Sequence, residues 1–250
     1  MSKRPLFDGE EILCRPALEL AAAIRRGDRR AVDVLDMFLR RIDRHNPSLN
    51  ALVAERFHAA RAEAQAIDDA VAAGVDPGPL AGVPFTTKEM ACVEGLPVTA
   101  GSLNRRDAFA DRDSTFVARL RDAGAIPIGV TNQSELGLWW ESVNPVYGRT
   151  NNPYDLRRTC GGSSGGEGAM LGGGLTGFGV GSDMGGSIRL PALFCGVFGH
   201  KPTHGAVPIS GHFPIDYSDH RLPNPPSHRM VSIGPMSRHA FDLLPGGDRQ

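Results

Sequence analysis

The chain has 250 residues, with 27 basic and 28 acidic side chains and a formal net charge of −1. Because proteins that hold nucleic acid carry excess positive charge, this balance predicts no nucleic-acid partner. An apolar fraction of 41% suffices for a packed core, whereas no stretch reaches the ~18 consecutive apolar residues of a transmembrane helix. With no secretory leader and no Cys-x-x-Cys pair, the sequence predicts a soluble cytoplasmic enzyme without disulfides.

The amino-terminal region predicts a helical layer over residues 1–75. Apolar residues recur at helical spacing in three stretches, and each stretch is closed by Gly27, by the His45-Asn46-Pro47 segment or by Gly74. A polar, proline-containing arm precedes the first stretch. We expect the arm at residues 1–15 and the three helices at residues 16–27, 32–45 and 56–73.

Strand signals begin after this helical layer. Val83–Thr87 is a short, partly β-branched run that predicts a buried strand, with Lys88 at its end. Residues 114–123 predict a helix capped by Ser114, and residues 126–130 predict a second strand. Because strands and helices alternate from there onward, we expect an α/β domain with a mixed central β-sheet flanked by helices.

The segment from Cys160 to Thr203 is the densest glycine region of the chain. Ser163 and Ser187 stand beside glycine pairs, where a serine is accessible and successive backbone N–H groups are free to stabilise an oxyanion. Apolar residues between the two glycine runs argue against a flexible linker, and no G-x-x-x-x-G-K-[ST] segment supports a phosphate loop. The region therefore favours acyl transfer.

Lys88 is one of three lysines in an arginine-rich chain, with Lys3 and Lys201. Arginine stays protonated at any accessible pH, but a desolvated lysine can lose its proton and act as a base. Taken alone, Lys88 is better interpreted as a solvated lysine that pairs with Glu89. Its place in a longer motif reverses that preference.

Four segments carry a resemblance to the amidase signature family of serine hydrolases, and the resemblance extends from about Leu18 to Arg238. It implies the fold of that family and the hydrolysis of a small-molecule amide, with no metal and no organic cofactor. The four segments are GVPFTTKEM (Gly82–Met90), GGSSGGEGA (Gly161–Ala169), GSDMGGSIRLPA (Gly181–Ala192) and CGVFGHKPT (Cys195–Thr203).

The resemblance also assigns the catalytic roles. It implies that Ser187 is the nucleophile, that Ser163 bridges Ser187 to the base Lys88, and that the peptide bond between Gly162 and Ser163 is cis. Ser187 would form an acyl-enzyme that water then hydrolyses. The implied oxyanion donors are the backbone N–H groups of Met184, Gly185, Gly186 and Ser187.

Glu167 and residues 194–214 resemble the fatty acid amide hydrolase branch of the family, which implies a hydrophobic acyl group or a broad range of amides. Two alternatives stay open: a glutamine-dependent amidotransferase A-type subunit that passes ammonia to a partner, and an inactive truncated amidase remnant. A Ser/His/Asp hydrolase that pairs Ser187 with His200 or His204 is a weaker alternative, because no G-x-S-x-G elbow surrounds Ser187.

The other polar residues receive structural interpretations. Arg189 is expected to hold Asp183 and stiffen the turn before the nucleophile, and Cys160 and Cys195 are expected to be small buried side chains. A metal site is not expected, because the histidines and aspartates of one proline-rich loop lack ligand spacing and are expected to be solvated. These loop residues are His212, His220, His228, Asp216 and Asp219. A role in shaping the acyl pocket is open to Asn132, Glu135, Trp139 and Trp140, although a pair of tryptophans is more often core or surface packing.

Members of the family continue well beyond the segment that corresponds to Gly234–Arg238. We therefore expect residues 1–250 to form a single incomplete domain with an unpaired sheet edge and an exposed apolar surface. Such a surface favours association, including a homo-oligomer, or marginal stability. We also expect Lys88 and Ser187 to lie near the open side and to be wetter than catalysis requires, with weak amide hydrolysis as the result.

Overall fold

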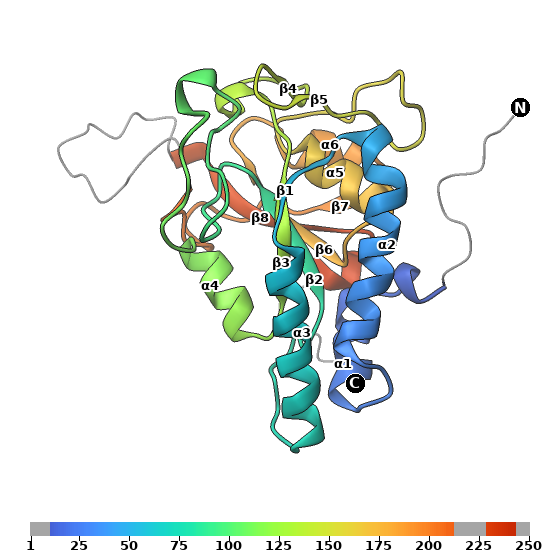
Figure 1. Cartoon of the computed structure of the whole chain (residues 1–250). Coiled ribbons are helices and arrows are strands. Elements are labelled where there is room, and N and C mark those ends of the chain that lie inside the picture. Colours follow the sequence, from blue (N-terminus) through green and yellow to red (C-terminus); the bar gives the residue numbers. More distant parts are fainter. Residues whose placement is uncertain (1–10, 213–228, 244–250) are drawn as a thin grey trace, which may run out of the picture.

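A mixed six-stranded sheet runs through the computed structural model, which describes residues 11–212 and 229–243 (Figure 1). The strand order is β1-β3-β2-β6-β8-β7; β2 is parallel to β3 and β6, and the other neighbours are antiparallel. The expected α/β class with a mixed central sheet is thus confirmed. The strands span Leu52–Glu55 (β1), Pro84–Lys88 (β2), Ile126–Thr131 (β3), Phe178–Asp183 (β6), Phe198–Gly199 (β7) and Ser232–Ser237 (β8), and a separate pair is formed by Val143–Asn144 (β4) and Gly148–Arg149 (β5).

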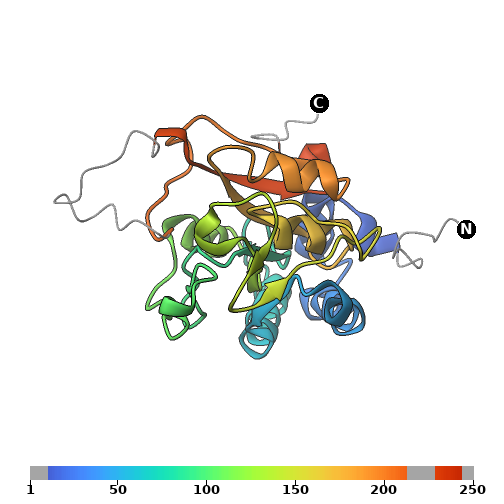
Figure 2. The same ribbon diagram turned by 90° about the horizontal axis from the view of Figure 1, so that it is seen from above.

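Helices flank this sheet, and Figure 2 places α2 and α3, drawn blue and teal, on the opposite side of the molecule from α6, drawn orange. None of the described helices is both long and apolar enough to cross a bilayer. The α-helices span Ala17–Arg25 (α1), Ala31–Leu49 (α2), Phe57–Ala72 (α3), Thr115–Asp122 (α4), Gly165–Gly172 (α5) and Arg189–Phe194 (α6), and short 3₁₀ helices span Glu11–Cys14, Leu103–Arg105, Glu135–Gly137 and Ala240–Leu243.

The three amino-terminal helices lie where their apolar spacing predicts, but the region is not entirely helical. Helix α2 continues past Pro47 until Asn50, whose left-handed backbone (φ 52°) ends it. The Asn46 side chain accepts the N–H groups of Ala51 and Leu52 and so stabilises the turn into β1. Strand β1 pairs with β3 at the sheet edge, so the expectation of an all-helical layer is wrong. A four-residue strand leaves too short a pattern to detect in the sequence.

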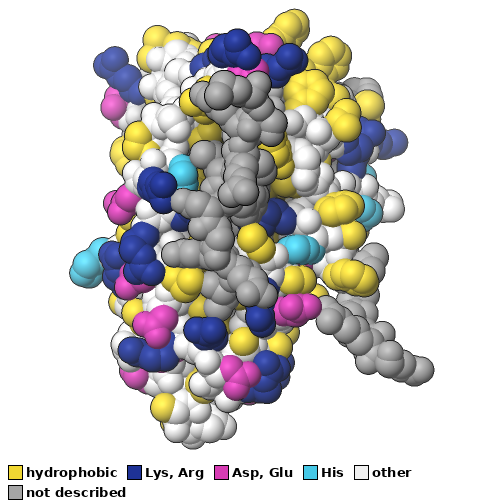
Figure 3. Space-filling model, turned by 90° about the vertical axis from the view of Figure 1, so that its right-hand side faces the viewer, with side chains coloured by type: hydrophobic (Ala, Val, Ile, Leu, Met, Phe, Trp, Pro, Cys, Tyr) yellow, Lys and Arg dark blue, Asp and Glu magenta, His cyan; other side chains and the backbone are white. Residues whose placement is uncertain are grey.

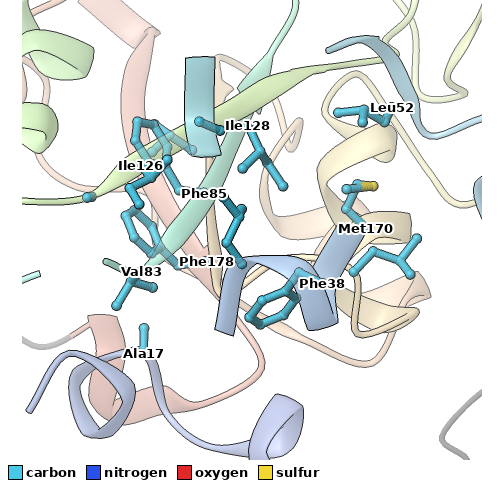
Figure 4. Close-up of a cluster of buried hydrophobic side chains, with 14 of the residues drawn as sticks. Ala17, Phe38, Leu52, Val83, Phe85, Ile126, Ile128, Met170 and Phe178 are labelled. Carbon is cyan, nitrogen blue, oxygen red and sulfur yellow. The ribbon is translucent and has the colours of Figure 1, made fainter. Parts of the chain in front are cut away.

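The hydrophobic core joins these helices to the strands, as Figure 4 shows. Phe85 on β2 and Phe178 on β6 stack with ring centroids 5.2 Å apart, and the side chain of Ile128 on β3 is fully buried. Phe38 reaches the same cluster from α2, and Met170 reaches it from α5. The core thus fixes β2, which ends at Lys88, and β6, which leads into the glycine-rich turn of Ser187.

Helix α5 is buried along its whole length, because glycines let it approach the strands closely. A Cβ on Gly166 would lie 2.6 Å from the backbone nitrogen of Asn132. A Cβ on Gly179 of β6 would occupy the place of the Glu167 carboxylate. This close packing holds the amino end of α5 beside the carboxyl ends of β2 and β6.

Helix α4 begins directly after Ser114, as the sequence predicts, but the expected side-chain cap is absent from the described hydrogen bonds. Ser114 occupies the N-cap position with extended backbone, yet its hydroxyl is buried and makes no described hydrogen bond. The loop at Gly211 packs directly against Ser114: a Cβ on Gly211 would lie 2.7 Å from that of Ser114. The prediction of a serine cap is therefore wrong, because a tertiary contact takes the place of the local one.

Candidate active site

Lys88 lies at the carboxyl end of β2 and is 2% exposed. Its Nζ donates to Ser163 Oγ at 2.5 Å and to Ser182 Oγ at 3.1 Å. Burial lowers the pKa of Lys88 to about 7, although the negative charge of Asp183 acts in the opposite direction. The expectation that Lys88 is wet and keeps its ordinary pKa is therefore wrong. The sheet and the two glycine-rich turns suffice to desolvate it.

Ser163 lies in the turn that leads into α5 and is 1% exposed. The peptide bond between Gly162 and Ser163 is cis, as the family resemblance implies. Ser142 holds this turn, because its hydroxyl donates to the Ser163 carbonyl at 3.3 Å and accepts the Gly165 N–H at 2.8 Å. The two expected partners Lys88 and Ser163 are thus in direct contact in the structure.

Ser187 lies in the turn after β6, which the backbone joins to the turn of Ser163. The Ser164 N–H donates to the Ser187 carbonyl at 3.1 Å, and the Ser164 hydroxyl donates to the Ser182 carbonyl at 3.3 Å. The Ser187 side chain is almost buried, and the described hydrogen bonds include none between Ser187 Oγ and Ser163 Oγ. The structure therefore brings the two serine turns together through their backbones.

Asp183 organises the turn that carries Ser187. Its buried carboxylate accepts the N–H groups of Gly186 at 2.8 Å and Ile188 at 3.0 Å, and two guanidinium nitrogens of Arg189 at 3.0 Å each. Burial raises the pKa of this carboxyl, but these donors outweigh burial and lower it to about 2. The expected pair of Arg189 with Asp183 is confirmed.

One of the four expected oxyanion donors is already engaged. The Gly186 N–H donates to Asp183, whereas no described hydrogen bond uses the N–H groups of Met184, Gly185 or Ser187. Met184 and Gly185 are exposed, so the outer part of this turn is open to solvent. The arrangement leaves three backbone donors around an accessible turn.

The four residues considered for the acyl pocket separate into one buried residue and three exposed ones. Asn132 is buried, and its side chain holds the neighbouring loop through bonds to Asn144 and Gly148. The Trp139 and Trp140 rings are exposed and stack 6.2 Å apart, and the Trp140 indole N–H donates to the Gly185 carbonyl at 3.3 Å. Glu135 is exposed and has no described bond to these residues.

Sequence reasoning missed Ser182 and Ser142, which support the lysine and the first serine turn. Ser182 has a usable signal, because it stands one residue before Asp183 at the end of a buried strand and therefore close to the turn of Ser187. Ser142 carries no local signal, since it stands in a loop without a recognisable motif and its partners lie 21 and 23 residues away.

The histidines divide between buried and exposed positions. His212 was expected to be solvated, but it is 6% exposed; burial and the nearby charge of Lys88 lower its pKa to about 3. His204 places Nδ1 2.7 Å from the Val231 carbonyl oxygen, and no described bond links Ser187 to His204 or His200.

Within residues 11–212 and 229–243, no cluster of three metal-ligating side chains occurs. Cys160 and Cys195 are buried free thiols, as expected, and His220, His228, Asp216 and Asp219 lie outside the described residues.

Comparison with known proteins identifies relatives of this arrangement. The family model described as Amidase matches residues 33–245. Fatty-acid amide hydrolase 2 of Homo sapiens is 45% identical over 251 residues, which cover 98% of this chain and 46% of that protein. A glutamyl-tRNA(Gln) amidotransferase subunit of Bdellovibrio bacteriovorus is 43% identical over 189 residues, which cover 76% of this chain and 38% of that protein.

A solved structure shows the same similarity in three dimensions. A fatty acid amide hydrolase superposes with a TM-score of 0.85 at 29% identity, over 96% of this chain and 41% of that chain. The chain spans about half the length of the curated relatives it matches.

Proposed function

The chain belongs to the amidase family, and from that premise we propose that it hydrolyses a carboxylic acid amide through an acyl-enzyme on Ser187. The observation that supports this most directly is the contact of Lys88 with Ser163 at 2.5 Å. A buried lysine whose pKa lies near 7 is half unprotonated at neutral pH, and it can then accept a proton from a serine.

The proposed reaction begins with proton transfer from Ser187 through Ser163 to Lys88. Ser163 passes its proton to Lys88 and takes the proton of Ser187, whose oxygen attacks the amide carbon. The oxyanion then accepts hydrogen bonds from the free backbone N–H groups of Met184, Gly185 and Ser187. Ser163 returns the proton to the amide nitrogen as the C–N bond breaks, because an amide anion does not leave at neutral pH. Water completes the cycle by hydrolysing the ester on Ser187.

An apolar acyl amide is the substrate class that we favour. Fatty-acid amide hydrolase 2 is among the relatives, the exposed Trp140 side chain bonds to the turn of Ser187, and Met184 within that turn is also exposed. Apolar side chains around a few convergent polar groups are typical of sites that bind small apolar ligands.

A role as an amidotransferase component is the second candidate, because one of the relatives, 43% identical to the chain, belongs to a glutamyl-tRNA(Gln) amidotransferase. The two candidates differ in substrate. Release of ammonia from a simple fatty acyl amide but not from glutamine supports the first, and the reverse result supports the second.

Labelling with a fluorophosphonate tests the nucleophile. We expect one label on Ser187, no label in Ser187→Ala, and full labelling in the matched control Ser210→Ala, whose serine is exposed on a loop. The His200→Ala chain should also label fully. Loss of labelling in folded His200→Ala would favour a Ser/His/Asp enzyme, and a folded but unlabelled wild-type chain would identify an inactive remnant.

A further inference from the structure

Trp140 contacts both serine-bearing turns. Its backbone lies against the first turn, since a Cβ on Gly162 would lie 2.8 Å from the Trp140 carbonyl carbon and 2.7 Å from the Glu141 nitrogen. Its side chain reaches the second turn, where the indole N–H donates to the Gly185 carbonyl at 3.3 Å. One residue thus connects the turn of Ser163 with the turn of Ser187.

The segment that follows Trp140 is also fixed to the first turn. The Ser142 N–H donates to the Gly161 carbonyl at 3.1 Å, and the Ser142 hydroxyl donates to the Ser163 carbonyl. The backbone of residues 140–142 therefore follows the cis turn as a fixed support. An indole on such a support has a defined position relative to Ser163.

The peptide unit between Gly185 and Gly186 is held from both sides. Its carbonyl accepts the Trp140 indole, and its N–H donates to the Asp183 carboxylate at 2.8 Å. Because a peptide unit is planar, bonds on its two opposite edges fix its rotation about the chain. That rotation also determines where the neighbouring N–H groups of Gly185 and Ser187 point. Gly185 and Gly186 have no side chains that would otherwise restrict the backbone there.

We infer that Trp140 is a positioning residue that sets the direction of the oxyanion donors and the spacing between the two serine turns. The inference rests on the proposed acyl-enzyme function. Trp140 acts through the Gly185–Gly186 peptide, so its indole N–H affects the chemical step rather than the affinity for the substrate. Trp139 is the matched comparison, because its ring is equally exposed but its indole N–H makes no described hydrogen bond.

The two tryptophans are the only ones in the chain, so Trp140→Phe and Trp139→Phe each leave a single indole. Both side chains are more than half exposed, and both variants are therefore expected to fold. In Trp140→Phe, we expect the backbone amide NMR signals of Gly185, Gly186 and Ser187 to shift. The maximal rate of fluorophosphonate labelling should fall about three- to tenfold, the range for loss of one hydrogen bond, with the half-saturating concentration within about twofold. Trp139→Phe should leave both measurements unchanged.

The two readouts separate failure of this inference from failure of the proposed function. If wild type labels on Ser187 but Trp140→Phe labels as fast as Trp139→Phe, the inference is overturned and the proposed function stands. A change in half-saturation alone also overturns it, because Trp140 would then be a binding contact. If wild type is folded but does not label, the proposed function fails and the rate role of Trp140 fails with it, whatever the amide signals show.

Discussion

Lys88 makes the proposed reaction depend on pH at the level of a single residue. Only the unprotonated amine accepts a proton from Ser163, and burial lowers the Lys88 pKa from 10.5 to about 7. We therefore expect the labelling rate of Ser187 to rise about tenfold per pH unit below pH 7 and to level off above about pH 8. Fluorophosphonate labelling rates, measured on samples quenched at set times between pH 5 and pH 10, give this profile.

The matched variants of this experiment are Lys88→Arg and Lys201→Arg. Arginine does not lose its proton, so Lys88→Arg should be slow across the whole pH range. Lys201 lies outside the site and donates to the Met230 carbonyl, so Lys201→Arg should keep the wild-type profile. A wild-type midpoint near 10.5 would contradict the role assigned to the buried lysine.

At the scale of elements, the packing of α5 against the sheet buries the carboxyl group of Glu167, where the ionised form is unfavourable. Glu167 is fully buried and accepts the hydroxyls of Thr86 on β2 and Thr131 on β3 at 2.8 Å each. Burial raises its pKa to about 8, although the two hydroxyls act to lower it. The carboxyl is therefore mostly protonated in the folded chain at neutral pH.

This shift makes the stability of the fold depend on pH. Between about pH 4.5 and pH 8 the unfolded chain releases the Glu167 proton while the folded chain keeps it, so folding stability falls as pH rises. Glu167→Gln cannot ionise, and its free energy of unfolding relative to wild type should increase between pH 5 and pH 8. The increase should be on the order of 3 to 5 kcal/mol, from the size of the shift.

Urea unfolding at both pH values measures this difference. The exposed Glu135→Gln is the control, and it should follow wild type at each pH. The contributions of other titrating groups, including Lys88, to the unfolding free energy cancel, because each variant is compared with wild type at the same pH. Parallel stability curves for Glu167→Gln and wild type would show that Glu167 is ionised inside the fold.

The elements differ in how far the sequence predicts them, and the reason is the length of their pattern. Helices α1 to α3 repeat an apolar spacing over several turns, and strand β2 is marked by a β-branched run. Strand β8 contains Gly234 and Pro235, which argue against a strand, yet it lies between β6 and β7. Its partners supply the order: Pro235 pairs with Val180, and its carbonyl accepts the His200 N–H.

The candidate site shows the same division. Lys88 and Ser163 are predicted by the motifs and lie in contact, and Ser182 is marked by its place at the end of a buried strand. Ser142 depends on tertiary proximity that no local pattern encodes. The engaged Gly186 N–H is likewise invisible in the sequence, because glycine-rich turns show which groups are unobstructed but not which are already bonded.

For the molecule as a whole, the surface determines how copies of the chain behave toward one another. On the face shown in Figure 3, basic and acidic side chains are interspersed among hydrophobic ones over the described surface. Helix α6 and the edge strand β7 add a group of exposed large side chains: Leu193 is 74% exposed, Phe198 is 50% exposed, and Phe194 is also exposed. An edge strand beside exposed apolar side chains favours association.

We therefore expect the chain to self-associate as its concentration rises, and Leu193→Lys to raise the concentration that is required. The control is Val75→Lys, which adds the same charge at an exposed position after α3, far from α6 in the sequence. Sedimentation velocity over a concentration series measures the effect. Equal shifts in both variants would show that net charge, rather than the α6 and β7 surface, controls association.

The contact between Lys88 and Ser163 joins residues 75 positions apart, and that between Lys88 and Ser182 joins residues 94 positions apart. Contacts of such separation form late, because a long loop must close before they contribute. In a nascent or partly folded chain the lysine is solvated and protonated, and the serines have ordinary alcohol reactivity. On the proposed mechanism, Ser187 therefore becomes reactive only when β2 and β6 are paired, and the chain carries no activated serine during synthesis and folding.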